Sequence, residues 1–339
     1  MEFSKRIVIA FCVALLLTAL LTSYAEIRED SPYRFHELTI YVVPSPVELD
    51  WSSPATLYQT YRKSLISAVL TGNSYSSGHL FIKLTTPLLE DPLYAGMSSL
   101  SRKEQKNWVY KEKAGLGVLG VGIKGKMENG EDLTPLENYY VRKNSLAAIT
   151  YRIGDNAAEK ILRFFENFDI EDDNGHLPSL HYGGAFWPLY EKEGAGCTAF
   201  GIAMLELAGV SKEEMDSWKH EVNIPMSLIG GELNPGNVVK IRDIKNAENW
   251  HNGTGEANID FVKYSIYDPS LIFNWILEKL SGSEKKTSLE YYDASTPTTP
   301  RLFSDIRDIE IDSESPIFFP RYDENLFIYH FLKTNGLLD

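Results

Sequence analysis

The chain has 339 residues, of which 43% are hydrophobic and 12% are aromatic, and this composition is sufficient for a large folded core. Its formal net charge is −14 at pH 7. Because nucleic acids are bound by basic surfaces, this charge argues against nucleic acid as the main partner. It also gives little attraction to anionic lipid, so a membrane contact is expected only through an uncleaved N-terminal leader.

The N-terminal residues 1–25 have the three parts of a secretory signal peptide. Lys5 and Arg6 precede a long apolar run, and Ala25 ends a small-residue cleavage site. Cys12 lies inside the apolar run and not at the first mature position, so a lipoprotein signal is not indicated. The sequence therefore predicts export to the periplasm or the extracellular space. The apolar run is also about as long as a short membrane span, so an N-terminal membrane anchor is the alternative.

The first half of the mature chain alternates between strand and helix patterns. Residues 36–46 are rich in β-branched and aromatic side chains and end in prolines, which predicts a strand. A Ser-Pro start and apolar residues at three- and four-residue steps predict a helix at 53–70. Alternating apolar residues predict a strand at 78–86, and residues 87–107 show no regular pattern. These alternating patterns predict an α+β fold.

Further elements are expected along the rest of the chain. They are one or two strands within 108–128, helices over 133–153 and 156–168, a short helix from 212, a turn and a strand at 234–244, and a strand followed by a helix at 261–280. Residues 281–301 are rich in Ser, Thr and Pro and predict a linker or surface wrap, followed by an aromatic C-terminal stretch. We therefore divide the mature chain into one domain, 26–280, and a linker with an aromatic C-terminal segment, 281–339.

Cys197 is the only cysteine outside the leader, so no intramolecular disulfide can form. The stretch GAGCTAFGIAMLELAGV, residues 194–210, predicts an apolar helix with Cys197 in its first turn and Gly209 at its end. Unpaired N–H groups and the positive end of the helix stabilise a thiolate there, and they can also receive a developing oxyanion. A buried cysteine that acts as a small hydrophobe is the alternative, and catalysis needs a base.

His79 is the best-placed base among the seven histidines. It follows Gly78 at the start of an apolar strand, where a side chain can face a cleft while the strand behind it packs in the core. A histidine on an exposed strand edge is the alternative. His181 lies in the segment 176–187, which we expect to form a wall of the cleft, and it is the fallback base.

Gly-His followed by alternating apolar residues, and the later Gly-Cys-Thr-Ala-Phe-Gly-Ile-Ala-Met-Leu-Glu-Leu-Ala-Gly, resemble the circularly permuted branch of the papain-like NlpC superfamily. The resemblance covers roughly residues 36–210. It implies a papain-like domain in which the helix bearing Cys197 packs on a small antiparallel sheet carrying His79. It further implies that Cys197 attacks a carbonyl and that His79 accepts and returns the proton. A third polar group usually orients the imidazole, and Glu128 is the candidate here, at the end of a strand region that is otherwise mostly glycine and aliphatic.

No cofactor or metal ion is predicted. GLGVLG, residues 115–120, matches the dinucleotide fingerprint, but the residues after it are poor helix formers. The acidic stretch 169–176 lacks the spacing of a calcium loop. His36 and His220 each begin a zinc-protease motif whose second histidine is missing.

Three functions fit these observations. The leading hypothesis is an exported cysteine-nucleophile hydrolase of amide or ester bonds in a peptide, peptidoglycan fragment or acyl substrate. An acyltransferase acting on lipid or lipoprotein shares the acyl-cysteine intermediate, and a deep apolar groove beside Cys197 would favour it. A non-catalytic binding module on the same scaffold would be favoured by a buried Cys197 beyond hydrogen-bond reach of any histidine. The sequence gives no oligomeric state.

Overall fold

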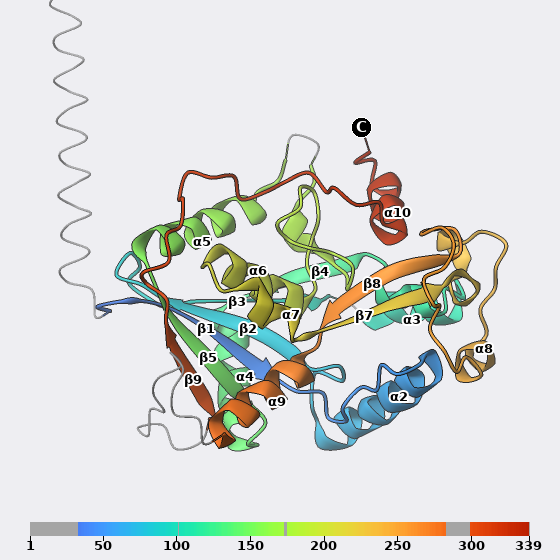
Figure 1. Ribbon diagram of the computed structural model, residues 1–339, viewed down its shortest axis with the longest axis horizontal. Helices are drawn as coiled ribbons and strands as arrows, with labels where there is room; N and C mark the ends of the chain where they lie inside the picture. The colour runs from blue at the N-terminus through green and yellow to red at the C-terminus, as the bar shows by residue number, and fades with distance from the viewer. Residues whose placement is uncertain (1–32, 101, 173–174, 283–298, 339) are drawn as a thin grey trace, which may run out of the picture.

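The computed structural model describes residues 33–100, 102–172, 175–282 and 299–338. The predicted leader and most of the Ser/Thr/Pro-rich stretch lie outside these residues. The fold is of the mixed α+β class that the sequence predicted, with a seven-stranded sheet, helices on both of its faces and a separate two-stranded sheet (Figure 1).

The main sheet has the strand order β6-β4-β3-β2-β1-β5-β9. Neighbouring strands are antiparallel except β5 and β9, which are parallel. The sheet is thus larger than the small antiparallel sheet that the resemblance implied, and one of its strand pairs is parallel. The strands are β1 (His36–Val43), β2 (His79–Thr85), β3 (Leu93–Ser99), β4 (Ile123–Glu128), β5 (Ala147–Ile153), β6 (His181–Tyr182) and β9 (Arg301–Asp305).

The second sheet is a hairpin of β7 (Lys219–Pro225) and β8 (Phe261–Tyr267). The α-helices of the described residues are α2 (Pro54–Thr71), α3 (Arg102–Tyr110), α4 (Gly130–Arg142), α5 (Asp155–Phe168), α6 (Cys197–Leu207), α7 (Lys212–Asp216), α8 (Ile241–Lys245), α9 (Pro269–Ser281) and α10 (Leu326–Thr334).

The two faces of the main sheet carry different cores. Leu80, Ile82 and Leu84 of β2 join the large core formed with α5, α6 and α9, and Figure 1 shows α6 and α9 on one side of the sheet. Phe81 packs on the other face, with Tyr140 of α4. This alternation along β2 is the one that the sequence predicted. His79 is the first residue of β2 and therefore lies at one end of the strand.

The predicted strands over 36–46 and 78–86 are confirmed as β1 and β2, and the helices over 53–70 and 156–168 as α2 and α5. The strand and helix within 261–280 are confirmed as β8 and α9.

The predicted helix over 133–153 is correct only in its first part, α4. Its second part is β5, which lies between β1 and β9 and is buried along almost its whole length. The strand begins with Ala147 and Ala148, which favour a helix and continue the pattern of α4. The β-branched residues Ile149 and Thr150 favour the strand conformation that the structure shows.

Two other stretches also differ from expectation. Residues 87–107 contain β3 and most of α3, because small residues in LYAGMSS hide the strand's alternation. Only the last part of 108–128 is a strand, β4, and the start of that stretch completes α3. No strand is present within 234–244, where α8 begins instead.

The chain from residue 299 onward lies against the body of the protein. β9 pairs with β5 at the edge of the sheet, and Phe327 of α10 is fully buried in the core of the β7–β8 hairpin. Figure 1 shows this part of the chain running from β9, past α5, to α10. Within the described ranges, no helix combines the length and apolarity needed to cross a membrane.

Candidate active site

Cys197 is the first residue of α6, as the sequence predicted, and Gly196 is the N-cap. The thiol is free and partly exposed. One turn further along the helix, a Cβ at Gly201 would overlap the side chain of Leu80. The absence of a side chain at Gly201 therefore lets α6 lie close against β2. This packing brings the start of α6 to the start of β2.

His79 is the residue of β2 that meets the thiol. The residue is 1% exposed, and its imidazole interacts with the thiol of Cys197, because each of the two groups shifts the pKa of the other. The structure thus brings together the two residues that the sequence singled out as nucleophile and base.

Glu128 is the last residue of β4, and its carboxylate reaches the imidazole of His79. Its Oε2 lies 2.9 Å from Nε2 of His79, and the residue is only 7% exposed. Glu128 is the residue that the sequence offered as the orienting group. The structure places it at the strand's end, in contact with the histidine.

Gly96 explains how Glu128 reaches His79 across an intervening strand. β3 lies between β2 and β4, and Gly96 is paired with Phe81 on one side and Glu128 on the other. A Cβ at Gly96 would lie 3.1 Å from Oε2 of Glu128 and 3.7 Å from Nε2 of His79. The missing side chain therefore leaves a path above β3 for the carboxylate.

Tyr75 holds both partners from one side, and sequence reasoning did not identify it. Its ring stacks on the His79 imidazole with centroids 3.8 Å apart and planes inclined by 5°. Its hydroxyl donates a hydrogen bond to Oε1 of Glu128 at 3.1 Å. The only signal in the sequence was the closeness of Tyr75 to His79 along the chain, because the contact with Glu128 depends on the sheet order.

Tyr182 comes from the segment that we expected to form a cleft wall. It lies on β6, beside β4, and its hydroxyl points at Sγ of Cys197 from 3.7 Å. Burial and the neighbouring Cys197 raise the pKa of Tyr182 well above 10. The hydroxyl therefore stays protonated and is a hydrogen-bond donor beside the nucleophile.

The charges of the thiol and the imidazole stabilise each other. Burial alone would raise the pKa of Cys197, but the hydrogen bond and the charge of His79 lower it to about 7. Burial alone would lower the pKa of His79, but Cys197 and Glu128 raise it to about 9. Glu128 is also buried, which would raise its pKa, but His79 lowers it. A thiolate–imidazolium pair is therefore the main form between these two values.

His181 is not brought to the thiol. Its ring stacks on His176 with centroids 4.7 Å apart and meets the ring of Phe331 edge-on. Burial and the charge of His176 lower the pKa of His181 to about 4. Neighbouring residues of a strand point to opposite faces, and on β6 the one directed at Cys197 is Tyr182. His79, and not the fallback base, therefore forms the pair.

The glycine-rich stretch 115–120 forms a single turn of 3-10 helix, Leu116–Leu119, with no α-helix directly after it. It therefore lacks the strand–turn–helix context of a dinucleotide site. Among the residues that the structure describes, no three His, Cys, Asp or Glu side chains gather in a way that could hold a metal ion.

Comparison of the chain with models of protein families, with curated proteins and with solved structures gives no match.

Proposed function

We propose that this protein is an exported thiol hydrolase that cleaves amide or ester bonds, with Cys197 as its nucleophile, in a papain-like arrangement of helix and sheet. The observation that carries the proposal is a connected series of side chains. The thiol at the start of α6 interacts with His79, which lowers the pKa of the thiol, and Nε2 of His79 faces the Glu128 carboxylate at 2.9 Å. A nucleophile, a base and an orienting acid in contact are the minimum for covalent acyl chemistry.

The first half of the reaction forms an acyl-enzyme. The Cys197 thiolate attacks the substrate carbonyl carbon, and the carbonyl π electrons move to oxygen. The backbone N–H at the start of α6 and the hydroxyl of Tyr182 lie beside Sγ and can donate to this oxyanion. The His79 imidazolium then gives its proton to the leaving amine or alkoxide as the carbon–nitrogen or carbon–oxygen bond breaks.

The second half releases the acid. Neutral His79 takes a proton from water, the resulting hydroxide attacks the thioester carbonyl, and the carbon–sulfur bond breaks to return the thiolate. Glu128 and Tyr75 keep the imidazole in one orientation through both halves, from its edge and its face respectively. The net reaction adds one water to the substrate.

The contact between Cys197 and His79 favours catalysis over a non-catalytic scaffold. Burial would raise the pKa of a cysteine that only packs in the core, whereas the pKa of the Cys197 thiol is lowered to about 7. The expected location outside the cytoplasm favours a peptide, a peptidoglycan fragment or an acyl compound as substrate.

The proposal is tested by trapping the acyl-enzyme. Purified mature protein is mixed with p-nitrophenyl acetate, quenched in acid and digested, and the Cys197 peptide is examined by mass spectrometry. We expect an acetyl group on Cys197 and p-nitrophenol release that Cys197→Ala abolishes. Release that is unchanged in Cys197→Ala, with no adduct in the wild type, would contradict the proposal. Addition of a primary amine separates hydrolysis from transfer, because acetate is the product of the first and an acetamide that of the second.

A further inference from the structure

The loop that leads into the nucleophile is tied to the C-terminal part of the chain. We define residues 183–196 as the nucleophile loop, because this segment connects Tyr182 to Cys197. The N–H of Ala195 donates to the carbonyl of His181 at 3.1 Å, which closes the loop at its base. The loop is thus joined directly to Tyr182 at one end and to Cys197 at the other.

Residues 317–323, which we define as the C-terminal strap, run along this loop. The N–H of Phe319 donates to the carbonyl of Leu189 at 2.9 Å, and the N–H of Glu191 donates to the carbonyl of Phe319 at 2.9 Å. The backbones of Tyr190 and Phe319 are thereby paired in parallel. The strap thus holds the outer part of the loop by its backbone.

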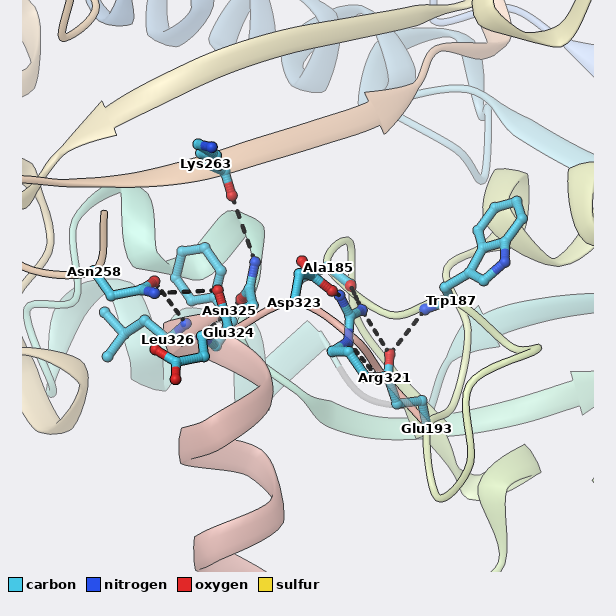
Figure 2. A network of polar contacts seen from close by, with 11 residues as sticks. Ala185, Trp187, Glu193, Asn258, Lys263, Arg321, Asp323, Glu324, Asn325 and Leu326 are labelled. Atoms are coloured by element: carbon cyan, nitrogen blue, oxygen red, sulfur yellow. Dashed lines mark hydrogen bonds and ion pairs between the residues drawn. The ribbon is translucent and has the colours of Figure 1, made fainter. Parts of the chain in front are cut away.

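Arg321 of the strap reaches into the loop with its guanidinium (Figure 2). Nε donates to Oε1 of Glu193 at 2.6 Å, and Nη2 donates to Oε2 of the same carboxylate at 3.0 Å. Nη2 also donates to the carbonyl of Ala185 at 3.2 Å, and Nη1 donates to Asp323 at 2.7 Å. Arg321 is therefore joined to both the early and the late part of the loop.

Glu193 connects the same two parts from inside the loop. Its Oε2 accepts a hydrogen bond from the N–H of Trp187 at 3.0 Å, and the residue is 1% exposed. Burial raises the pKa of Glu193 although Arg321 acts to lower it. A buried ion pair of this kind often adds little net stability, and in some proteins it fixes one arrangement of the groups around it.

We propose that Arg321 and Glu193 are positioning residues that set the nucleophile loop so that Cys197 and Tyr182 meet His79. This inference rests on the proposed function of Cys197. It assigns the C-terminal strap a role in the reactivity of a thiol that is more than a hundred residues away in the sequence.

The test is the pH dependence of Cys197 alkylation by iodoacetamide in Glu193→Gln and Arg321→Lys. If the pair positions the loop, both variants raise the apparent pKa of the thiol toward its ordinary value near 8.5 and slow alkylation at pH 7 by roughly fivefold or more. Arg307→Lys is the matched control, because Arg307 forms a bidentate pair with Asp305 outside the strap. We expect this control to react as the wild type does.

The sign of the effect distinguishes positioning from a simple charge effect. If only the field of the ion pair acted on the thiol, removal of the negative Glu193 would lower the pKa of Cys197, and Arg321→Lys would leave it unchanged. A lowered or unchanged thiol pKa in Glu193→Gln, or an unchanged one in Arg321→Lys, would overturn the inference. Circular dichroism melts confirm that each variant is folded at the assay temperature, and either folded variant alone decides the question.

Failure of this inference can be told from failure of the proposed function. A wild-type thiol with an ordinary pKa that does not respond to His79→Ala would contradict the proposed function itself. A wild-type thiol with a lowered pKa, together with wild-type behaviour of the strap variants, would contradict only the positioning role.

Discussion

At the scale of single residues, the contact between Glu128 and His79 depends on the absence of a side chain at Gly96. Gly96 opens the path over β3 between Glu128 and His79, and a Cβ there would already be 3.1 Å from the carboxylate. We expect Gly96→Val to push Glu128 away from the imidazole and to lower kcat/KM by up to about 100-fold. Gly130→Ala is the control, because a Cβ at Gly130 meets only Tyr94, at 3.9 Å. Equal activity of Gly96→Val and the wild type would show that the Glu128 contact is dispensable.

The charges of the pair predict a bell-shaped pH profile for amide hydrolysis. The rate rises through about pH 7 as the Cys197 thiolate forms and falls above about pH 9 as His79 loses the proton that the leaving group needs. Since Glu128 raises the pKa of His79, Glu128→Gln should move the falling limb to lower pH. Alkylation needs only the thiolate and should lack the falling limb. A falling limb that does not move in Glu128→Gln would contradict the orienting role of Glu128.

At the scale of elements, the packing of α6 on β2 sets the distance between nucleophile and base. Gly201 is the contact point, and a side chain there would overlap Leu80. We expect Gly201→Val to lower the free energy of unfolding by about 1–3 kcal/mol, the usual effect of overpacking a core. The same change should raise the pKa of Cys197 by separating it from His79. Urea unfolding measures the first effect and alkylation the second. An unchanged thiol pKa in the folded variant would show that the packing of α6 on β2 does not position Cys197 relative to His79.

The elements that the sequence predicted best are those whose two sides differ in composition. β2 alternates between residues of two different cores, and α5 has exposed residues opposite its buried ones, so both show clear periodicity. β5 was mistaken for helix because Ala147 and Ala148, which favour helices, precede the alternating residues Ile149–Ile153. β3 was missed because its glycine and serines give no alternation. That omission also hid the path by which Glu128 reaches the histidine.

The site itself was predictable where local signals exist. Cys197 and His79 each stand at a boundary that the sequence marks with glycine, Gly196 before the helix and Gly78 before the strand. The roles of Tyr75, Tyr182 and the strap depend on which strands and loops become neighbours. Such contacts between distant parts of one chain carry no local sequence signal.

At the scale of the whole molecule, the chain beyond residue 299 is part of the same folded body. β9 covers the edge of β5, and α10 buries Phe327 and Phe331. We expect a protein that ends at Ser281 to lose cooperative unfolding, because the β5 edge and these apolar contacts become exposed. Thermal melts of the truncated and full mature chains measure this. A truncated chain with the melting temperature of the full chain would contradict the assignment of this part to the core.

The measurement that tests the central claim most directly is the pH dependence of Cys197 alkylation by iodoacetamide in the mature wild type and in His79→Ala. The proposed pair predicts an apparent thiol pKa of about 7 in the wild type and a rise of that value when His79 is replaced, because the imidazolium is what stabilises the thiolate. A thiol that reacts only after denaturation, or with the same ordinary pKa in both proteins, would show that Cys197 and His79 are not a catalytic pair.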